Sequence, residues 1–69
     1  MSENWGYILS MMFPDELAAY GSYTVEEFPR SLRRKIQRFD GSSNSHASII
    51  CTLAAFHKCR ERMKKHLYF

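Results

Sequence analysis

The chain of 69 residues contains few residues that favour β-strands. Apart from Val25, its β-branched residues are Thr24, Thr52 and four isoleucines, so the composition predicts a helical protein. No apolar run approaches the roughly 20 residues that span a bilayer, and we expect no contact with a membrane. The first 13 residues contain no lysine or arginine, so they lack the positively charged start of a secretory signal peptide.

Patterns typical of disulfides and metal sites are also missing. Cys51 and Cys59 lie in one expected helix, where their Cα atoms would be about 12 Å apart, too far for a disulfide. His46, His57 and His66 have no spacing relative to the cysteines that is typical of a zinc site. We therefore expect a cytoplasmic protein with free thiols and without a metal or other cofactor.

Catalytic patterns are missing as well. The sequence has no glycine-rich phosphate loop, and its histidines are offset from its cysteines by five and two positions. These offsets place the side chains on different faces of a helix, so no nucleophile has a base within reach. We expect a protein that is not an enzyme.

What the sequence does contain is apolar spacing typical of helices. Residues 3–12 place four apolar side chains on one face: Trp5, Ile8, Leu9 and Met12. Residues 14–20 begin with a proline followed by two carboxylates, which favours a helix start, and Gly21 follows them. Two short helices are predicted in this part of the chain.

The second part of the chain predicts two longer helices. Residues 25–39 begin with a capping box, in which Glu27 reaches back to Thr24, although Pro29 also permits a short turn followed by a helix from Pro29. Their apolar face consists of Phe28, Leu32, Ile36 and Phe39. Residues 46–67, capped by Ser45 or Asn44, carry a stripe interrupted by Arg60, namely Ile49, Leu53, Phe56, Met63 and Leu67.

These elements predict an all-α fold. We expect one domain, residues 1–69, built as a small bundle or open array of three to four helices with a long C-terminal helix. A core of this size supplies only about 3–5 kcal/mol of net stability. The long helix also has more apolar surface than its short partners can cover, so we expect a homodimer.

Charge is divided sharply along the chain. Residues 1–28 contain five acidic residues and no basic residue, whereas residues 29–69 contain all ten basic residues and two acidic ones. The modest net charge of +3 therefore combines an acidic segment of −5 with a basic segment of +8. Such asymmetry indicates an interaction surface.

The basic segment contains one ordered row of arginines. Arg30, Arg34 and Arg38 recur every four residues, which aligns them on one helix face over about 12 Å, and Arg33 and Lys35 flank this row. Arginine forks match phosphate oxygens, so the row is a candidate nucleic-acid contact. The alternative is a solvated face that the acidic segment of the protein partly neutralises.

A standard helix-turn-helix does not fit this sequence. If Gly21 is the turn glycine, Leu17 stands where a small residue is needed and Glu27 where a branched apolar residue is needed. If Ala18 is the small residue, Ser22 replaces the turn glycine. Any nucleic-acid contact would therefore use an atypical helix-turn-helix or another arrangement of helices.

The acidic segment is also aromatic, with six of the ten aromatic residues. Trp5, Phe13 and Phe28 are predicted to lie in the core of so small a domain. Tyr20 and Tyr23 lie beside Gly21, and we expect them to be exposed and to contact a protein partner.

In size and composition the chain is similar to small regulatory proteins of phages and mobile elements. We therefore expect a non-enzymatic regulatory protein that binds and inhibits a protein partner, for example an antirepressor or an inhibitor of a transcription factor. The alternative is a nucleic-acid-binding protein that places the Arg30, Arg34 and Arg38 row on phosphates.

Overall fold

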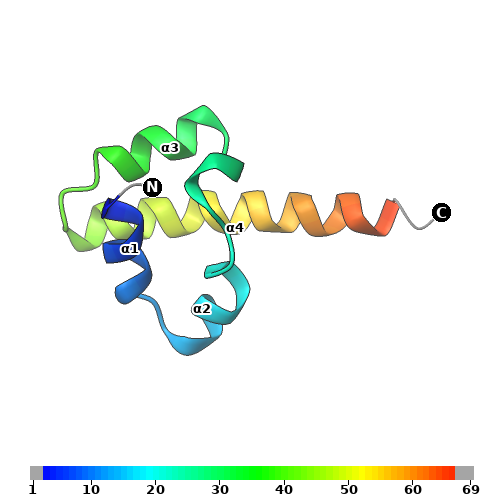
Figure 1. The fold of residues 1–69 in the computed structure, drawn as a ribbon, viewed down its shortest axis with the longest axis horizontal. Helices are drawn as coiled ribbons and strands as arrows, with labels where there is room; N and C mark the ends of the chain where they lie inside the picture. Colours follow the sequence, from blue (N-terminus) through cyan, green and yellow to red (C-terminus); the bar gives the residue numbers. More distant parts are fainter. Residues whose placement is uncertain (1–2, 67–69) are drawn as a thin grey trace.

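The computed structural model describes residues 3–66 of the chain. This part folds into four α-helices and one short 3-10 helix, so the predicted all-α fold with a long C-terminal helix is confirmed. In chain order the elements are α1 (Glu3–Ser10), α2 (Pro14–Tyr20), η1 (Val25–Glu27), α3 (Arg30–Gln37) and α4 (Ser43–His66) (Figure 1). No helix in the described part is long and apolar enough to cross a membrane.

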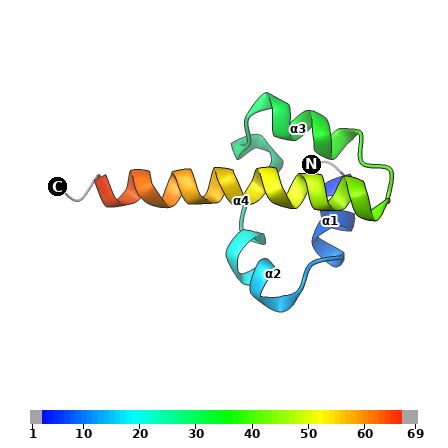
Figure 2. The ribbon, with the colours of Figure 1, turned by 180° about the vertical axis from the view of Figure 1, so that it is seen from behind.

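The long helix α4 organises the fold. Helix α3 lies along its first half and runs antiparallel to it after a short connecting loop, whereas α1 contacts α3 and crosses α4 steeply (Figure 1). The end of α4 extends beyond the other helices, as the view from behind also shows (Figure 2). The molecule is therefore longer in one direction, with principal extents of 42 × 26 × 21 Å.

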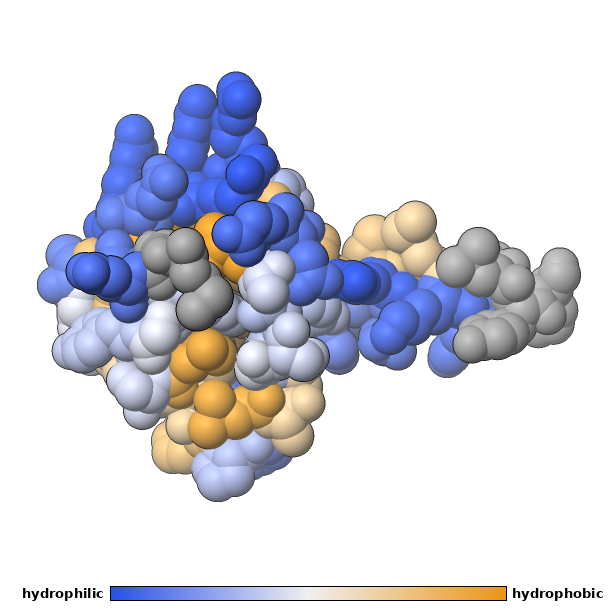
Figure 3. Space-filling model, in the orientation of Figure 1, coloured by the Kyte–Doolittle hydropathy of each residue, from blue (hydrophilic) through white to orange (hydrophobic). Residues whose placement is uncertain are grey.

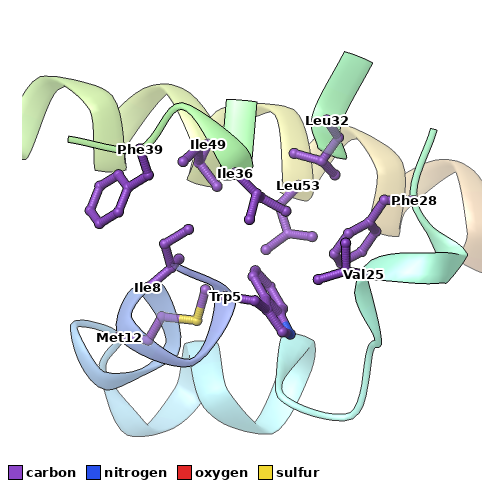
Figure 4. Close-up of a cluster of buried hydrophobic side chains, with 10 residues drawn as sticks. All are labelled: Trp5, Ile8, Met12, Val25, Phe28, Leu32, Ile36, Phe39, Ile49 and Leu53. Carbon is purple, nitrogen blue, oxygen red and sulfur yellow. The ribbon is translucent and has the colours of Figure 1, made fainter. Parts of the chain in front are cut away.

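The core consists of ten buried apolar side chains from α1, η1, α3, α4 and the residues that follow these elements (Figure 4). Trp5 of α1 packs edge-to-face against Phe28, with 5.2 Å between the ring centroids, and its indole N–H donates to the carbonyl oxygen of Tyr23 at 3.1 Å. Both rings were predicted to be buried, and both are. The complete set is Trp5, Ile8, Met12, Val25, Phe28, Leu32, Ile36, Phe39, Ile49 and Leu53.

Two predicted core residues lie at the surface. Phe13 is 72% exposed because it is the cap residue of α2, whose extended backbone before Pro14 turns its side chain away from the core. Met63 is 62% exposed because α4 continues past the last helix that covers its apolar stripe. The final member of that stripe, Leu67, lies outside the described residues.

Pro29 divides the predicted helix of residues 25–39 into two elements. Phe28 has an extended backbone (φ −85°, ψ 150°), as expected for a residue before proline, and α3 begins at Arg30. The alternative of a turn followed by a helix is therefore the correct one. The predicted reach of Glu27 is present, because its Oε2 accepts a hydrogen bond of 2.8 Å from the Thr24 N–H.

Helix α4 begins three residues earlier than predicted, and Ser42 caps it instead of Asn44 or Ser45. The Ser42 hydroxyl oxygen accepts a bond of 3.1 Å from the Ser45 N–H. Asp40 supports the turn, since its carboxylate accepts a bond of 2.9 Å from the Ser42 N–H, which lowers the pKa of Asp40. Gly41 has a φ of +84°, a conformation that suits glycine.

The start of α1 holds the end of α3. The Asn4 side-chain amide donates to the carbonyl oxygens of Ile36 and Gln37 at 3.0 and 3.1 Å. These carbonyls belong to the last turn of α3, where helical partners run out, and the Ile36 carbonyl also accepts from the Phe39 N–H at 3.2 Å. A residue near the beginning of the chain thus fixes the helix that carries the arginine row.

Candidate nucleic-acid interface

Helix α3 and its cap residue Arg38 carry five exposed cationic side chains, which we call the arginine surface. The helix is oriented by Leu32 and Ile36, both fully buried against α1 and α4. Because Arg30, Arg34 and Arg38 recur every four residues, the burial of the opposite face turns them outward. The complete arginine surface is Arg30, Arg33, Arg34, Lys35 and Arg38, all exposed.

The arginine surface contains two shallow hollows that meet at Arg34. One hollow, of about 370 Å³, lies between α3 and the start of α4 and is lined by Arg34, Lys35, Arg38 and three serines, Ser31, Ser45 and Ser48. The second, of about 240 Å³, is lined by Arg30, Arg33, Arg34 and Gln37. Cations accompanied by hydroxyls are the groups that proteins use on phosphate oxygens.

Lys35 is fixed in place between the two helices. Its ammonium donates to the hydroxyls of Ser48 (3.1 Å) and Thr52 (3.0 Å), which lie one turn apart on α4. These partners are neutral, so they orient Lys35 without cancelling its charge. The positive charge of the first hollow is therefore partly preorganised.

No carboxylate of the described residues pairs with the arginine surface. The ion pairs in this part of the chain are Arg60–Glu27, at 2.7 Å, which joins α4 to η1, and Lys64–Glu61, at 3.5 Å, which lies within α4. The row is a solvated face, as the alternative expected, and the acidic segment forms no direct ion pair with it in this part of the chain. An exposed row of cations without direct carboxylate partners attracts an anionic partner.

Glu27 of the acidic segment turns instead toward the middle of α4. The bond from the Thr24 N–H, followed by the ion pair with Arg60, holds the pKa of Glu27 below its usual value. The Arg60 guanidinium also lies over the Tyr23 ring, 5.2 Å from its centroid. The residue that interrupts the apolar stripe of α4 thus connects α4 to η1.

Tyr20 and Tyr23 are not the freely exposed side chains that we expected. Both are half-buried and pack against the core. The Tyr23 hydroxyl lies 2.6 Å from His57 Nδ1, and the Tyr20 ring meets the His57 ring edge-to-face at 5.4 Å. They join the end of α2 and the segment that follows it to α4, because the turn at Gly21 brings the chain back onto the long helix.

The exposed apolar side chains lie elsewhere, around the connection between α1 and α2. Met11, Phe13 and Leu17 form what we call the apolar corner, and Asp15 lies within the same stretch. Figure 3 shows the two opposite characters of the molecule, with hydrophilic side chains over α3 and hydrophobic ones on the side of α1 and α2. The apolar corner and the arginine surface therefore face different directions.

The structure adds no metal or disulfide candidate to these surfaces. Cys51 and Cys59 are free and exposed on α4. Within residues 3–66, no three side chains of the histidine, cysteine, aspartate or glutamate type come together to hold a metal ion. The hollows on α3 are thus the feature with the clearest ligand chemistry.

Some residues that surround the five cations were not identified from the sequence. The hydroxyls of Ser31, Ser45 and Ser48 contribute because α3 and α4 form a helical hairpin across a short loop. Ser48 and Thr52 could have been found from the sequence, because a spacing of four residues places both on one face of α4, where they bind Lys35. Asn4 has no comparable signal, because its bonds to α3 span more than 30 residues.

Comparison of the chain with protein-family models, with curated proteins and with solved structures found no match. A proposal for its function therefore rests on the geometry and charge of the chain itself.

Proposed function

We propose that this chain is a small non-enzymatic regulatory protein that binds nucleic acid through the arginine surface of α3. The observation that carries the proposal is the set of five exposed cations, none of which pairs with a carboxylate of the described residues. The two hollows would each receive a backbone phosphate, with Arg34 between them. Contacts of this kind position a protein on nucleic acid without reading its sequence.

Arginine is the appropriate residue for this role. Its planar guanidinium donates two parallel hydrogen bonds to phosphate oxygens, and it is more weakly hydrated than an ammonium group, so less free energy is lost on contact. Binding releases counterions from the nucleic acid, which makes the affinity strongly dependent on salt.

A salt titration of the wild-type protein with a fluorescent 20-base-pair DNA duplex tests the proposal. We expect the logarithm of the association constant to fall linearly with the logarithm of salt concentration, with a slope of about −4.5 if all five cations contact phosphates. Fluorescence anisotropy measures the affinity at each salt concentration. Absence of binding at low salt, or an affinity that salt does not change, would contradict the proposal.

A second function, binding and inhibition of a protein partner, is favoured by the apolar corner. Phe13 and Leu17 are exposed although they are large and apolar, and such side chains anchor protein interfaces. We expect wild-type protein to capture a partner stoichiometrically from host lysate and the variant Phe13→Ser to lose it. Because Phe13 is outside the core, this variant keeps the fold, and equal capture by both proteins would count against the corner.

We also propose that the protein is a cytoplasmic homodimer. The exposed thiols of Cys51 and Cys59 suit a reducing compartment. A groove of about 540 Å³ beside the projecting part of α4, lined in part by Phe56, Cys59 and Met63, offers apolar surface to a second copy. Light scattering on the purified protein gives its mass directly, and the mass of a monomer would refute this part of the proposal.

A further inference from the structure

The end of α4 is a projecting basic helix. His57 still packs against Tyr20 and Tyr23, and Arg60 pairs with Glu27, but the last turn and a half of the helix, residues 61–66, extends beyond the other helices (Figures 1 and 2). After Phe56 the helix contains five basic residues against Glu61, namely Lys58, Arg60, Arg62, Lys64 and Lys65. Among them only Arg60 forms an ion pair with another helix of the described part, so the charge of the others needs another explanation.

Three of these cations form a row with a defined direction. Lys58 lies nine residues after the buried Ile49, which at about 100° per residue places it on the opposite face of α4. Arg62 and Lys65 follow at four and seven residues from Lys58, on the same face. All three are exposed, and none of them pairs with a carboxylate of residues 3–65.

The other two cations of this stretch are engaged on different sides of the helix. Arg60 pairs with Glu27 and lies over Tyr23, and Lys64 pairs with Glu61. The helix therefore keeps one side for contacts within the protein and leaves one basic side open. Charge complementarity on the open side favours a polyanion.

The dimensions of this helix fit one polyanion in particular. An α-helix with its side chains is about 10–12 Å in diameter, and the major groove of B-form DNA is about 12 Å wide. The major groove of an RNA duplex is deep and too narrow for such a helix. Helix α3, which begins at Arg30, runs antiparallel to α4, so its first turn lies at the end nearest to the projecting part of α4 (Figure 1).

We infer that the projecting end of α4 enters the major groove of duplex DNA with Lys58, Arg62 and Lys65, as a contact separate from the arginine surface of α3. This inference rests on the proposed function and adds to it the class of nucleic acid and a second contact element. The phosphates provide attraction at α3, and base edges in the groove become accessible to Arg62, whose fork matches guanine O6 and N7.

The sharpest test compares two single substitutions that remove the same charge two residues apart. Arg62→Gln changes the open basic side, whereas Lys64→Gln changes the side that pairs with Glu61. Both positions are exposed and glutamine is a good helix former, so helix content by circular dichroism should not change. We expect Arg62→Gln to weaken binding to duplex DNA about tenfold and Lys64→Gln to weaken it less than about twofold.

An RNA duplex of the same sequence gives the second measurement. Wild-type protein should bind DNA about tenfold more tightly than this RNA, and Arg62→Gln should bind the two almost equally, because only DNA admits the helix. Equal effects of the two substitutions, or equal wild-type affinity for DNA and RNA, would overturn the inference. If binding nevertheless depends on salt and on α3, the proposed function stands and only the role of α4 fails; if wild-type protein binds neither duplex, both fail.

Discussion

Replacing Arg30, Arg34 and Arg38 together by alanine is expected to lower the affinity for duplex DNA at least a hundredfold at 0.1 M salt. Each charged contact to a phosphate contributes about 1 kcal/mol or more, and three are lost together. The salt dependence should also become shallower by about three units of slope, roughly one for each contact. Anisotropy titrations of wild-type and variant proteins at several salt concentrations measure both effects.

The fold should survive this triple substitution. The three side chains are exposed and make no hydrogen bond or ion pair within the described residues, and alanine favours a helix. The matched control replaces the same three arginines by lysine, which keeps the charge and loses the planar fork. We expect the lysine variant to retain most of the salt slope at a reduced affinity. Unchanged affinity of the alanine variant would remove α3 from the binding site.

The variant Trp5→Ala is expected to be largely unfolded at 25 °C. Trp5 is only 2% exposed, packs edge-to-face on Phe28 and donates to the carbonyl oxygen of Tyr23. Truncating such a side chain costs about 3–5 kcal/mol, which equals the whole net stability that a core of this size supplies. Circular dichroism and thermal unfolding measure the loss.

A conservative control separates packing from the hydrogen bond. Trp5→Phe keeps most of the buried ring and loses the indole N–H, so it leaves the Tyr23 carbonyl oxygen without its donor and should cost about 1–3 kcal/mol. We expect this variant to fold with a lower melting temperature. A Trp5→Ala protein that melts cooperatively near the wild-type temperature would show that the α1 contacts are not essential to the core.

Helical periodicity predicted the parts of the fold that pack against one another. The apolar faces of residues 3–12 and of residues 28–39 are buried as expected, because both face a neighbouring helix. The predicted burial is wrong at Met63, where no neighbouring helix is present. Periodicity shows which residues share a helix face, but it does not show whether another helix packs on that face. Phe13 fails for a local reason, because the cap before Pro14 turns its side chain outward.

The candidate site was only partly predictable in the same way. The spacing of Arg30, Arg34 and Arg38 indicated a common face, but only the packing of Leu32 and Ile36 shows that this face meets solvent. Whether the acidic segment neutralises that face depends on tertiary distances, and Glu27 turns out to reach Arg60. The half-buried state of Tyr20 and Tyr23 likewise follows from a chain reversal that their sequence position does not reveal.

Helix α4 is packed along only one part of its length, and this has a thermodynamic consequence for DNA binding. A helix frays from an end that no tertiary contact holds, because its last turns depend on propensity alone. Ordering these turns in a groove costs conformational entropy that contacts on the packed helix α3 do not incur. Warming should therefore weaken the contact of α4 with the groove before the contact of α3 with the backbone. At intermediate temperatures the protein should bind DNA through α3 alone.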